Sequence, residues 1–298
     1  MADSNINAKH KDRLFSFIFG KEKNKKWTLE LYNAVNHSDY KDPDEIEINT
    51  IEDFLYMGMK NDVSFLLHSS LNLYEHQSTY NPNMPVRQLI YIGQLYDKYI
   101  KQNSLNIYGS SKITLPVPKL VTFYNGTTDA DDETDLNLSD LFPEKDNSES
   151  DVALRVRMLN INHGHNKELL EKCRPLFEYS WVVEQIRINR RNKLPIEDAV
   201  NKALDDMPDG FSIKAYLMEH RAEVNIMCLT EYDEAETMNM FKEEGRKEGR
   251  KEGLKEGLKE GLEKGLEQGI KEGEAERRRL EAEIERLRKE NEELKTRK

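Results

Sequence analysis

The sequence predicts an α/β protein: a mixed sheet flanked by helices, followed by a helical C-terminal half and a long helical, coiled-coil tail. Segments rich in β-branched and aromatic residues alternate with helical patterns up to about residue 165. From residue 166 apolar residues recur at three- and four-residue intervals, and from residue 241 a glycine-leucine repeat begins. We therefore expect a core over 8–165, a helical region over 166–240 packed on that core, and a tail over 241–298.

Two helices and an edge strand are expected before residue 50. KDRLFSFIFG has the pattern of a short amphipathic helix, with its apolar residues on one side and a natural end at Gly20. NKKWTLELYNAVN has the pattern of a second helix. The alternation of Ile46, Ile48 and Thr50 then predicts an edge strand.

Residues 61–79 form the segment around which the rest of the chain is organised. DVSFLL and LNLYEHQ have the composition of two β-strands joined by a turn at HSS. Side chains alternate along a strand, so Glu75 and Gln77 lie on one face and His76 on the other. In a hairpin Asp62 comes near Glu75 and Gln77, and such a group suits a hard cation such as Mg²⁺. The alternative is a turn aspartate followed by the polar face of a half-exposed strand.

The remaining elements follow from the same patterns. A helix is expected over 84–99, and strands are expected at KLVTFYNG and at VALRVRMLNIN. The stretch between these strands, TTDADDETDLNLSDLFPEKDNSESD, is acidic and poor in apolar residues, so we expect a surface loop there. Further helices are expected at NKELLEKCRPLFEYSWVVEQIRINRRN, PIEDAVNKALDDM and FSIKAYLMEHRAEVNIMCL.

The densest basic cluster before the tail consists of Arg187, Arg190, Arg191 and Lys193. Arginine suits bidentate contacts with phosphate, so this cluster is a candidate DNA-binding surface. The alternative is a solvated helix end that balances acidic neighbours.

Composition narrows the class of protein. The net charge of −11 does not by itself indicate a nucleic-acid binder, although a local basic face can act within an acidic chain. The two cysteines show no metal-ligand spacing, which favours a reduced, cytoplasmic protein. His163 and His165 are residue types that often bind metals, but no third ligand is spaced nearby in the sequence. We therefore expect them to lie in a loop without a metal. No apolar run is long enough to suggest a membrane span.

The tail is an internal repeat. Glycine recurs every fourth residue from Gly245 to Gly273, and an aliphatic residue follows one position behind from Leu254 to Ile270. A four-residue step drifts by about 40° per repeat around a helix, and each glycine lowers helix stability by about 1 kcal/mol. Packing against a partner must therefore supply the stability.

From residue 280 the tail changes its spacing. Apolar and amide residues follow steps of four, three, four and three: Leu280, Ile284, Leu287, Asn291 and Leu294. This is a coiled-coil seam, and an asparagine at an a position favours a parallel homodimer in fixed register. The alternative is a single charged helix.

A family resemblance starts at the hairpin. Asp62, followed after about a dozen residues by Glu75-x-Gln77, is the order of a PD-(D/E)XK-type nuclease site, with Gln77 in place of the usual lysine. LYEHQSTYNPNMPVRQLIYIGQLYDKYI, KLVTFYNG, LNINHGHNKELLEKC, HRAEVNIMCLTEYDE and the glycine-leucine tail extend the likeness over roughly Asp12 to Gly273. Over this span the chain resembles the recombination-promoting nuclease and putative transposase family of bacteria.

The resemblance implies a restriction-endonuclease-like core and a Mg²⁺- or Mn²⁺-dependent DNA endonuclease linked to recombination or mobile DNA. Asp62 and Glu75 would hold the metal, and Gln77 would position a water or phosphate oxygen without acting as a base. Asp12 or Glu22 would add a further acidic contact, as first-helix acids do in such nucleases. The alternative, favoured by the acidic charge and the missing lysine, is a non-catalytic oligomeric adaptor or DNA-binding protein that retains the nuclease fold.

Overall fold

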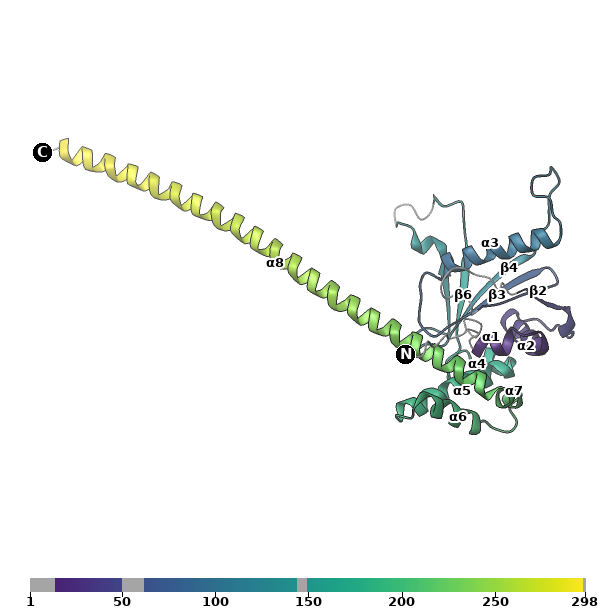
Figure 1. Ribbon diagram of the computed structural model, residues 1–298. Coiled ribbons are helices and arrows are strands. Elements are labelled where there is room, and N and C mark those ends of the chain that lie inside the picture. Colours follow the sequence, from purple (N-terminus) through teal and green to yellow (C-terminus); the bar gives the residue numbers. More distant parts are fainter. Residues whose placement is uncertain (1–13, 50–61, 144–148, 297–298) are drawn as a thin grey trace, which may run out of the picture. The chain divides into compact units, whose positions relative to one another are not determined.

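The computed structural model describes residues 14–49, 62–143 and 149–296. The chain divides into two compact units, one up to Ala235 and one from Glu236 onward. The first unit contains a mixed sheet with helices on both faces, so the expected α/β class is confirmed (Figure 1). The predicted long C-terminal helix is also present.

The described strands form one six-stranded sheet in the order β1-β2-β3-β4-β6-β5. Pairing is parallel between β3, β4 and β6, and antiparallel for β1 with β2, β2 with β3, and β5 with β6. The bounds are β1 Ile46–Ile48, β2 Asp62–Leu67, β3 Ser70–Gln77, β4 Val117–Tyr124, β5 Glu133–Asn137 and β6 Arg155–Asn160. β1 is an edge strand, as the alternation of its isoleucines predicts.

One face of the sheet is covered by α3 (Met84–Gln102), which connects β3 to its parallel neighbour β4 (Figure 1). Alternate residues of β3, Leu71 and Leu73, join a hydrophobic cluster with Ile92 and Leu95 of α3. Alternation along β3 places Glu75 and Gln77 on this same face. The helix begins beside the carboxyl ends of β3 and β4, so its first turn covers Glu75 and Gln77 of the predicted site.

The other face carries the larger hydrophobic cluster, to which the helices before and after the sheet contribute. Their bounds are α1 Leu14–Phe19, α2 Lys25–Asn36, α4 Lys167–Lys172, α5 Arg174–Arg191, α6 Ile196–Asp205 and α7 Lys214–Glu219. Short 3-10 turns cover Glu22–Asn24, Pro43–Glu45 and Leu138–Leu141. The sequence predicts that α1 is amphipathic, with one exposed side. Instead, every residue of α1 is buried, so the helix is enclosed on all sides.

Other segments also differ from the sequence-based expectations. The helix expected at FSIKAYLMEHRAEVNIMCL is interrupted at His220, between α7 and the helix that begins at Arg221. The acidic stretch predicted as a loop contains β5, whose carboxylates form ion pairs across the sheet edge with arginines of β6. The helix predicted over 166–192 is two helices, α4 and α5, separated at Cys173, which has an extended backbone. Pro175, in the first turn of α5, has no N–H, so the hydrogen bonding of α4 cannot continue through this position, whereas proline is well tolerated in the first turn of a new helix.

The last helix, α8 (Arg221–Thr296), belongs to both units. Within the first unit Val224, Met227 and Cys228 are buried in the larger cluster. Within the second unit α8 carries the glycine repeat as uninterrupted helix. None of the helices that the structure describes combines the length and apolar character needed to cross a membrane.

Candidate functional site

The predicted hairpin places the two proposed carboxylate positions opposite each other. β2 and β3 pair antiparallel, and the register partner of Asp62 is Glu75. On the other side of β3, the partner of Glu75 is Thr122 of β4. Asp62 begins β2, but its side chain lies outside what the structure describes. The backbone therefore supplies the spacing that the sequence analysis proposed, at the carboxyl end of the parallel strands, where ligands bind in open α/β sheets.

Glu75 and Gln77 are buried and lie in contact with each other. The Glu75 side chain is 3% exposed, and its Oε1 lies 2.5 Å from a terminal nitrogen of Arg87 on α3. Gln77 Nε2 donates to the same Glu75 Oε1 at 3.4 Å and also contacts the sulfur of Met84. Gln77 Oε1 is buried and has no hydrogen-bond partner in the described part of the chain. The Arg87 guanidinium therefore lies against a buried carboxylate, next to an amide oxygen that could accept one more contact.

Arg87 is the residue of this site that the sequence analysis missed. It lies in the first turn of α3, one residue before Gln88, whose amide donates to Thr122 Oγ1 at 3.1 Å. The helical spacing predicted a helix packed on the sheet, but it did not indicate which strand residue a polar side chain of that helix would meet. A sequence signal does exist, because Arg87 closely follows the Glu-x-Gln strand in the segment that begins α3.

His76 faces the opposite side of the sheet, as the alternation predicts. Its Nε2 lies 2.8 Å from the hydroxyl of Tyr179 on α5, and its ring stacks on Phe15 at 5.4 Å between centroids. On the same face, burial raises the pKa of the Tyr74 hydroxyl, which accepts a hydrogen bond from Asn36 at 2.9 Å. These contacts belong to the packed interior and hold β3 in place on the face opposite Glu75 and Gln77.

The two candidates for an additional acid differ in what can be said of them. Asp12 lies outside the described residues. Glu22 pairs with Lys25 at 2.7 Å, and its side chain is largely exposed. The described contacts give Glu22 a local surface role at the start of α2.

The predicted DNA-binding cluster has partners within the chain at three of its four positions. Arg187 donates to Asn162 Oδ1 at 2.8 Å and to the carbonyl oxygen of Asn125, residues that follow β6 and β4. Arg190 donates to the Leu194 carbonyl at 2.8 Å, and Arg191 pairs with Glu184 at 2.5 Å. Lys193 is exposed and has a left-handed backbone, with φ of 67°. Arg187 thus fastens α5 to the sheet, and DNA contact by this cluster stays a prediction.

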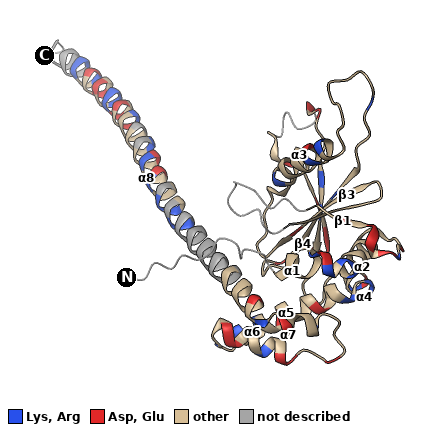
Figure 2. Cartoon of the chain, turned by 45° about the vertical axis from the view of Figure 1, so that its right-hand side comes forward, with Lys and Arg blue, Asp and Glu red and all other residues tan. Residues whose placement is uncertain are grey.

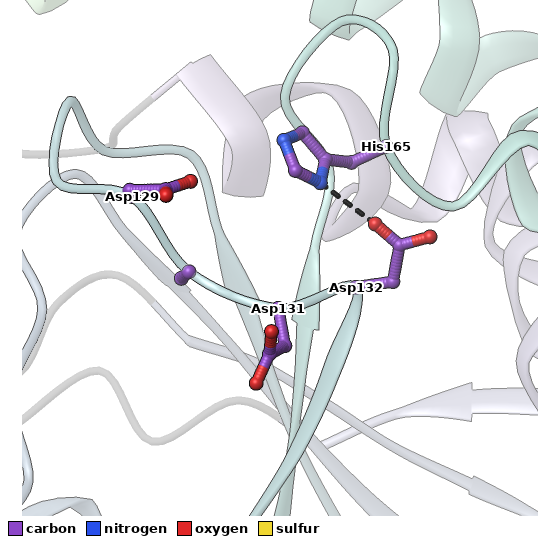
Figure 3. Close-up of a pocket in the computed structure, with 5 residues that line it drawn as sticks. Asp129, Asp131, Asp132 and His165 are labelled. Carbon is purple, nitrogen blue, oxygen red and sulfur yellow. Dashed lines mark hydrogen bonds and ion pairs between the residues drawn. The ribbon is translucent and has the colours of Figure 1, made fainter.

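The histidine pair lies in a loop, where His165 Nδ1 meets Asp132 Oδ1 at 2.7 Å. Asp129, Asp131, Asp132 and His165 line an open pocket of about 460 Å³. Figure 3 shows Asp132 turned toward His165, whereas Asp131 points away from it. Over the described residues, no group of three or more histidine, cysteine, aspartate or glutamate side chains is arranged to hold a metal ion. The pocket therefore presents a contact between a histidine and a carboxylate, together with separate carboxylates.

Both cysteines, Cys173 and Cys228, are buried and are not joined in a disulfide. Burial raises the pKa of the Cys173 thiol, so the thiolate is disfavoured.

The described side chains of the tail are exposed, including its aliphatic stripe. Leu254 is 75% exposed and Ile284 is 50% exposed, and the other aliphatic residues of the repeat and seam whose side chains are described have similar values. A Cβ added at any glycine from Gly249 to Gly273 would meet no atom within 4 Å. Figure 2 shows Lys and Arg interleaved with Asp and Glu along the described part of α8. Asn291 and Leu294 have side chains outside the described set.

Comparisons of the chain with protein-family models, with curated proteins and with solved structures found no match.

Proposed function

We propose that this protein is a metal-dependent DNA endonuclease with a restriction-endonuclease-like core, of the recombination-promoting nuclease type. The observation that carries the proposal is the register of β2 and β3, which sets Asp62 opposite Glu75, with Gln77 two residues further along β3. Residues directly opposite in an antiparallel pair share one face of the sheet. That face, at the carboxyl end of the parallel strands, also carries the buried Glu75 carboxylate.

The donor set fits a hard divalent cation. Asp62 and Glu75 offer carboxylate oxygens, and the buried amide oxygen of Gln77 has an unused acceptor position among the described residues. Oxygen ligands of this kind suit Mg²⁺ and Mn²⁺. An ion bound there would polarise the scissile phosphate and lower the pKa of a bound water.

The chain's own residues would position the reactants. Asp62 and Glu75 would hold the ion, and the ladder of β2 and β3 fixes the separation of their backbones. Gln77 is tied to Glu75 through its amide nitrogen, which leaves its oxygen to orient a water or a phosphate-bound group. Because an amide carries no charge near neutral pH, Gln77 does not replace the positive charge of the lysine that this position usually holds in PD-(D/E)XK sites.

A second candidate function is a non-catalytic adaptor or DNA-binding protein that keeps the nuclease fold. The ion pair between Glu75 and Arg87 favours it, because a carboxylate neutralised within the chain can serve structure alone. The two candidates make opposite predictions in one assay.

Purified protein should nick or cut DNA in Mg²⁺ or Mn²⁺ and be inactive in EDTA. Asp62→Ala and Glu75→Gln should each abolish cleavage while the purified variants still unfold in a cooperative thermal transition. Glu47→Gln, on the exposed edge of β1, is the matched control and should cleave like the wild type. Cleavage that survives both site substitutions would assign the activity elsewhere, and absence of cleavage in the folded wild type would favour the adaptor.

The tail supports assembly into a homodimer. Its aliphatic residues are exposed on one helix, and the space beside its described glycines is open, so a second helix could approach closely. Burying apolar surface gains roughly 25 cal/mol per Å², which would offset the low helix propensity of glycine. A dimer would also supply two active sites, as cutting both strands of DNA requires.

A further inference from the structure

We propose that Arg87 is the phosphate-binding cation of this site, held by Glu75 until a divalent ion takes its place. The inference rests on the proposed function and adds to it the residue that supplies the charge Gln77 lacks. Its basis is the contact between the Arg87 guanidinium and Glu75 Oε1 at 2.5 Å.

The first step of the argument is charge balance. A carboxylate that is 3% exposed has little water to solvate it and needs a positive partner. Arg87 supplies that charge. A divalent ion bound by Asp62 and Glu75 would supply it instead, and the two cations would then repel each other. The guanidinium and the ion therefore compete for Glu75.

The second step is reach. Arg87 is 27% exposed, so its guanidinium lies at the boundary between the buried carboxylate and solvent. It projects from the first turn of α3, on the face of the sheet that holds Glu75 and Gln77. An arginine displaced from Glu75 by a bound ion stays within a side chain's length of the site. Its planar fork matches the geometry of phosphate oxygens.

The third step is the amide oxygens. Gln77 Oε1 and Gln88 Oε1 are both buried, and neither has a hydrogen-bond partner among the described residues. A guanidinium that leaves Glu75 could donate hydrogen bonds to these oxygens, and an ion that binds at Glu75 could be coordinated by them. The site thus has acceptors for a cation beyond the one it now holds, which fits an exchange of partners better than a fixed structural pair.

The test separates metal binding from phosphate contact. In calorimetric titrations with Mn²⁺ and no DNA, Arg87→Gln should bind the ion about tenfold more tightly than the wild type, because a competing charge is gone. Single-turnover cleavage at saturating Mn²⁺ should nevertheless fall at least about tenfold. DNA binding in Ca²⁺ should lose about 0.9 from its slope of log affinity against log salt, the loss expected for one phosphate contact.

Two further variants make the result decisive. Lys101→Gln removes one charge from the far end of α3, where Lys101 pairs with exposed Asp97, and should leave all three quantities unchanged. Arg87→Lys keeps the charge on Glu75, so metal affinity should stay at the wild-type value while cleavage falls, because an ammonium cannot make the bidentate contact. Arg87→Lys also decides the matter if Arg87→Gln does not fold.

The outcomes distinguish this inference from the proposed function. If the wild type binds Mn²⁺ and Glu75→Gln does not, but the Arg87 variants match the wild type in cleavage and salt slope, Arg87 is structural and the nuclease proposal stands. If the wild type shows no binding that depends on Glu75, both proposals are overturned.

Discussion

Replacing Glu178 by glutamine should destabilise the first unit, because this carboxylate joins α5 to the start of α7. Glu178 is fully buried. Its Oε1 accepts from Arg174 Nε at 2.9 Å and from the backbone N–H of Ser212 at 2.9 Å. Its Oε2 accepts from the Ser212 hydroxyl at 2.8 Å and from the backbone N–H of Ile213 at 3.0 Å.

The expected magnitude follows from which of these bonds glutamine can keep. With its oxygen in the place of Oε1, the amide nitrogen faces the N–H of Ile213, and an unsatisfied buried donor costs about 1–3 kcal/mol. The Ser212 hydroxyl can rotate and accept instead. The weakened Arg174 pair adds at most about 1 kcal/mol, since that side chain is 59% exposed. The free energy of unfolding should fall by about 1–4 kcal/mol.

Urea unfolding followed by tryptophan fluorescence measures this change in the right unit, because Trp27 and Trp181 are the chain's two tryptophans and both precede the tail. Glu168→Gln is the matched control, since Glu168 makes an exposed ion pair with Lys172 and should change stability by less than about 0.5 kcal/mol. If Glu178→Gln unfolds within about 0.5 kcal/mol of the wild type, the claim that this carboxylate clamps the two helices is refuted.

The clamp also bears on the candidate site. The residue after Glu178 is Tyr179, whose hydroxyl meets His76 between Glu75 and Gln77 on β3. Cleavage by Glu178→Gln should therefore fall in proportion to the fraction of protein that is unfolded. The molecules that remain folded should bind metal with the wild-type affinity.

Three further predictions concern the tail, the basic cluster and acid. Truncation after Asn239 should yield a folded monomer that loses more double-strand cutting than nicking; light scattering showing a full-length monomer at roughly tens of micromolar, or a truncated dimer, would contradict assembly through the tail. Replacing both Arg191 and Lys193 by glutamine should weaken DNA binding and flatten its salt dependence, whereas an unchanged slope would make the cluster a solvated helix end. Burial raises the pKa of Glu30 above 4.5, so the folded state holds that proton more tightly than the unfolded state. The stability of the wild type relative to Glu30→Gln should therefore fall as pH rises above 4.5, and a relative stability that rises over this pH range would refute the assignment.

The sequence predicted best where stability is local and periodic. Alternation within β2 and β3 and a short turn between them are enough to set Asp62 opposite Glu75, because a slip of one residue would move every side chain to the opposite face of the sheet. The helix α3 and the edge strand β1 follow from similar patterns.

The sequence predicted poorly where a segment depends on partners far along the chain. The strand β5 has too few apolar residues to be recognised, and ion pairs with Arg155 and Arg157 hold it to β6. Arg187 belongs to a basic cluster and is therefore predicted to contact phosphate. Its hydrogen-bond acceptors are Asn125 and Asn162, which only the folded sheet brings next to α5. Arg87 was missed for the same reason, since the crossover from β3 through α3 creates its contact with Glu75.

The central claim is that Asp62 and Glu75 together hold a divalent ion. Crystals of the protein grown with Mn²⁺ and measured near the manganese absorption edge test it directly, because the anomalous signal locates the ion without reference to activity. We expect a peak between the carboxylates of Asp62 and Glu75, with the Arg87 guanidinium moved away from Glu75, and no such peak in crystals of Glu75→Gln. A fully occupied manganese peak among Asp129, Asp132 and His165, with Arg87 still paired to Glu75, would contradict the account.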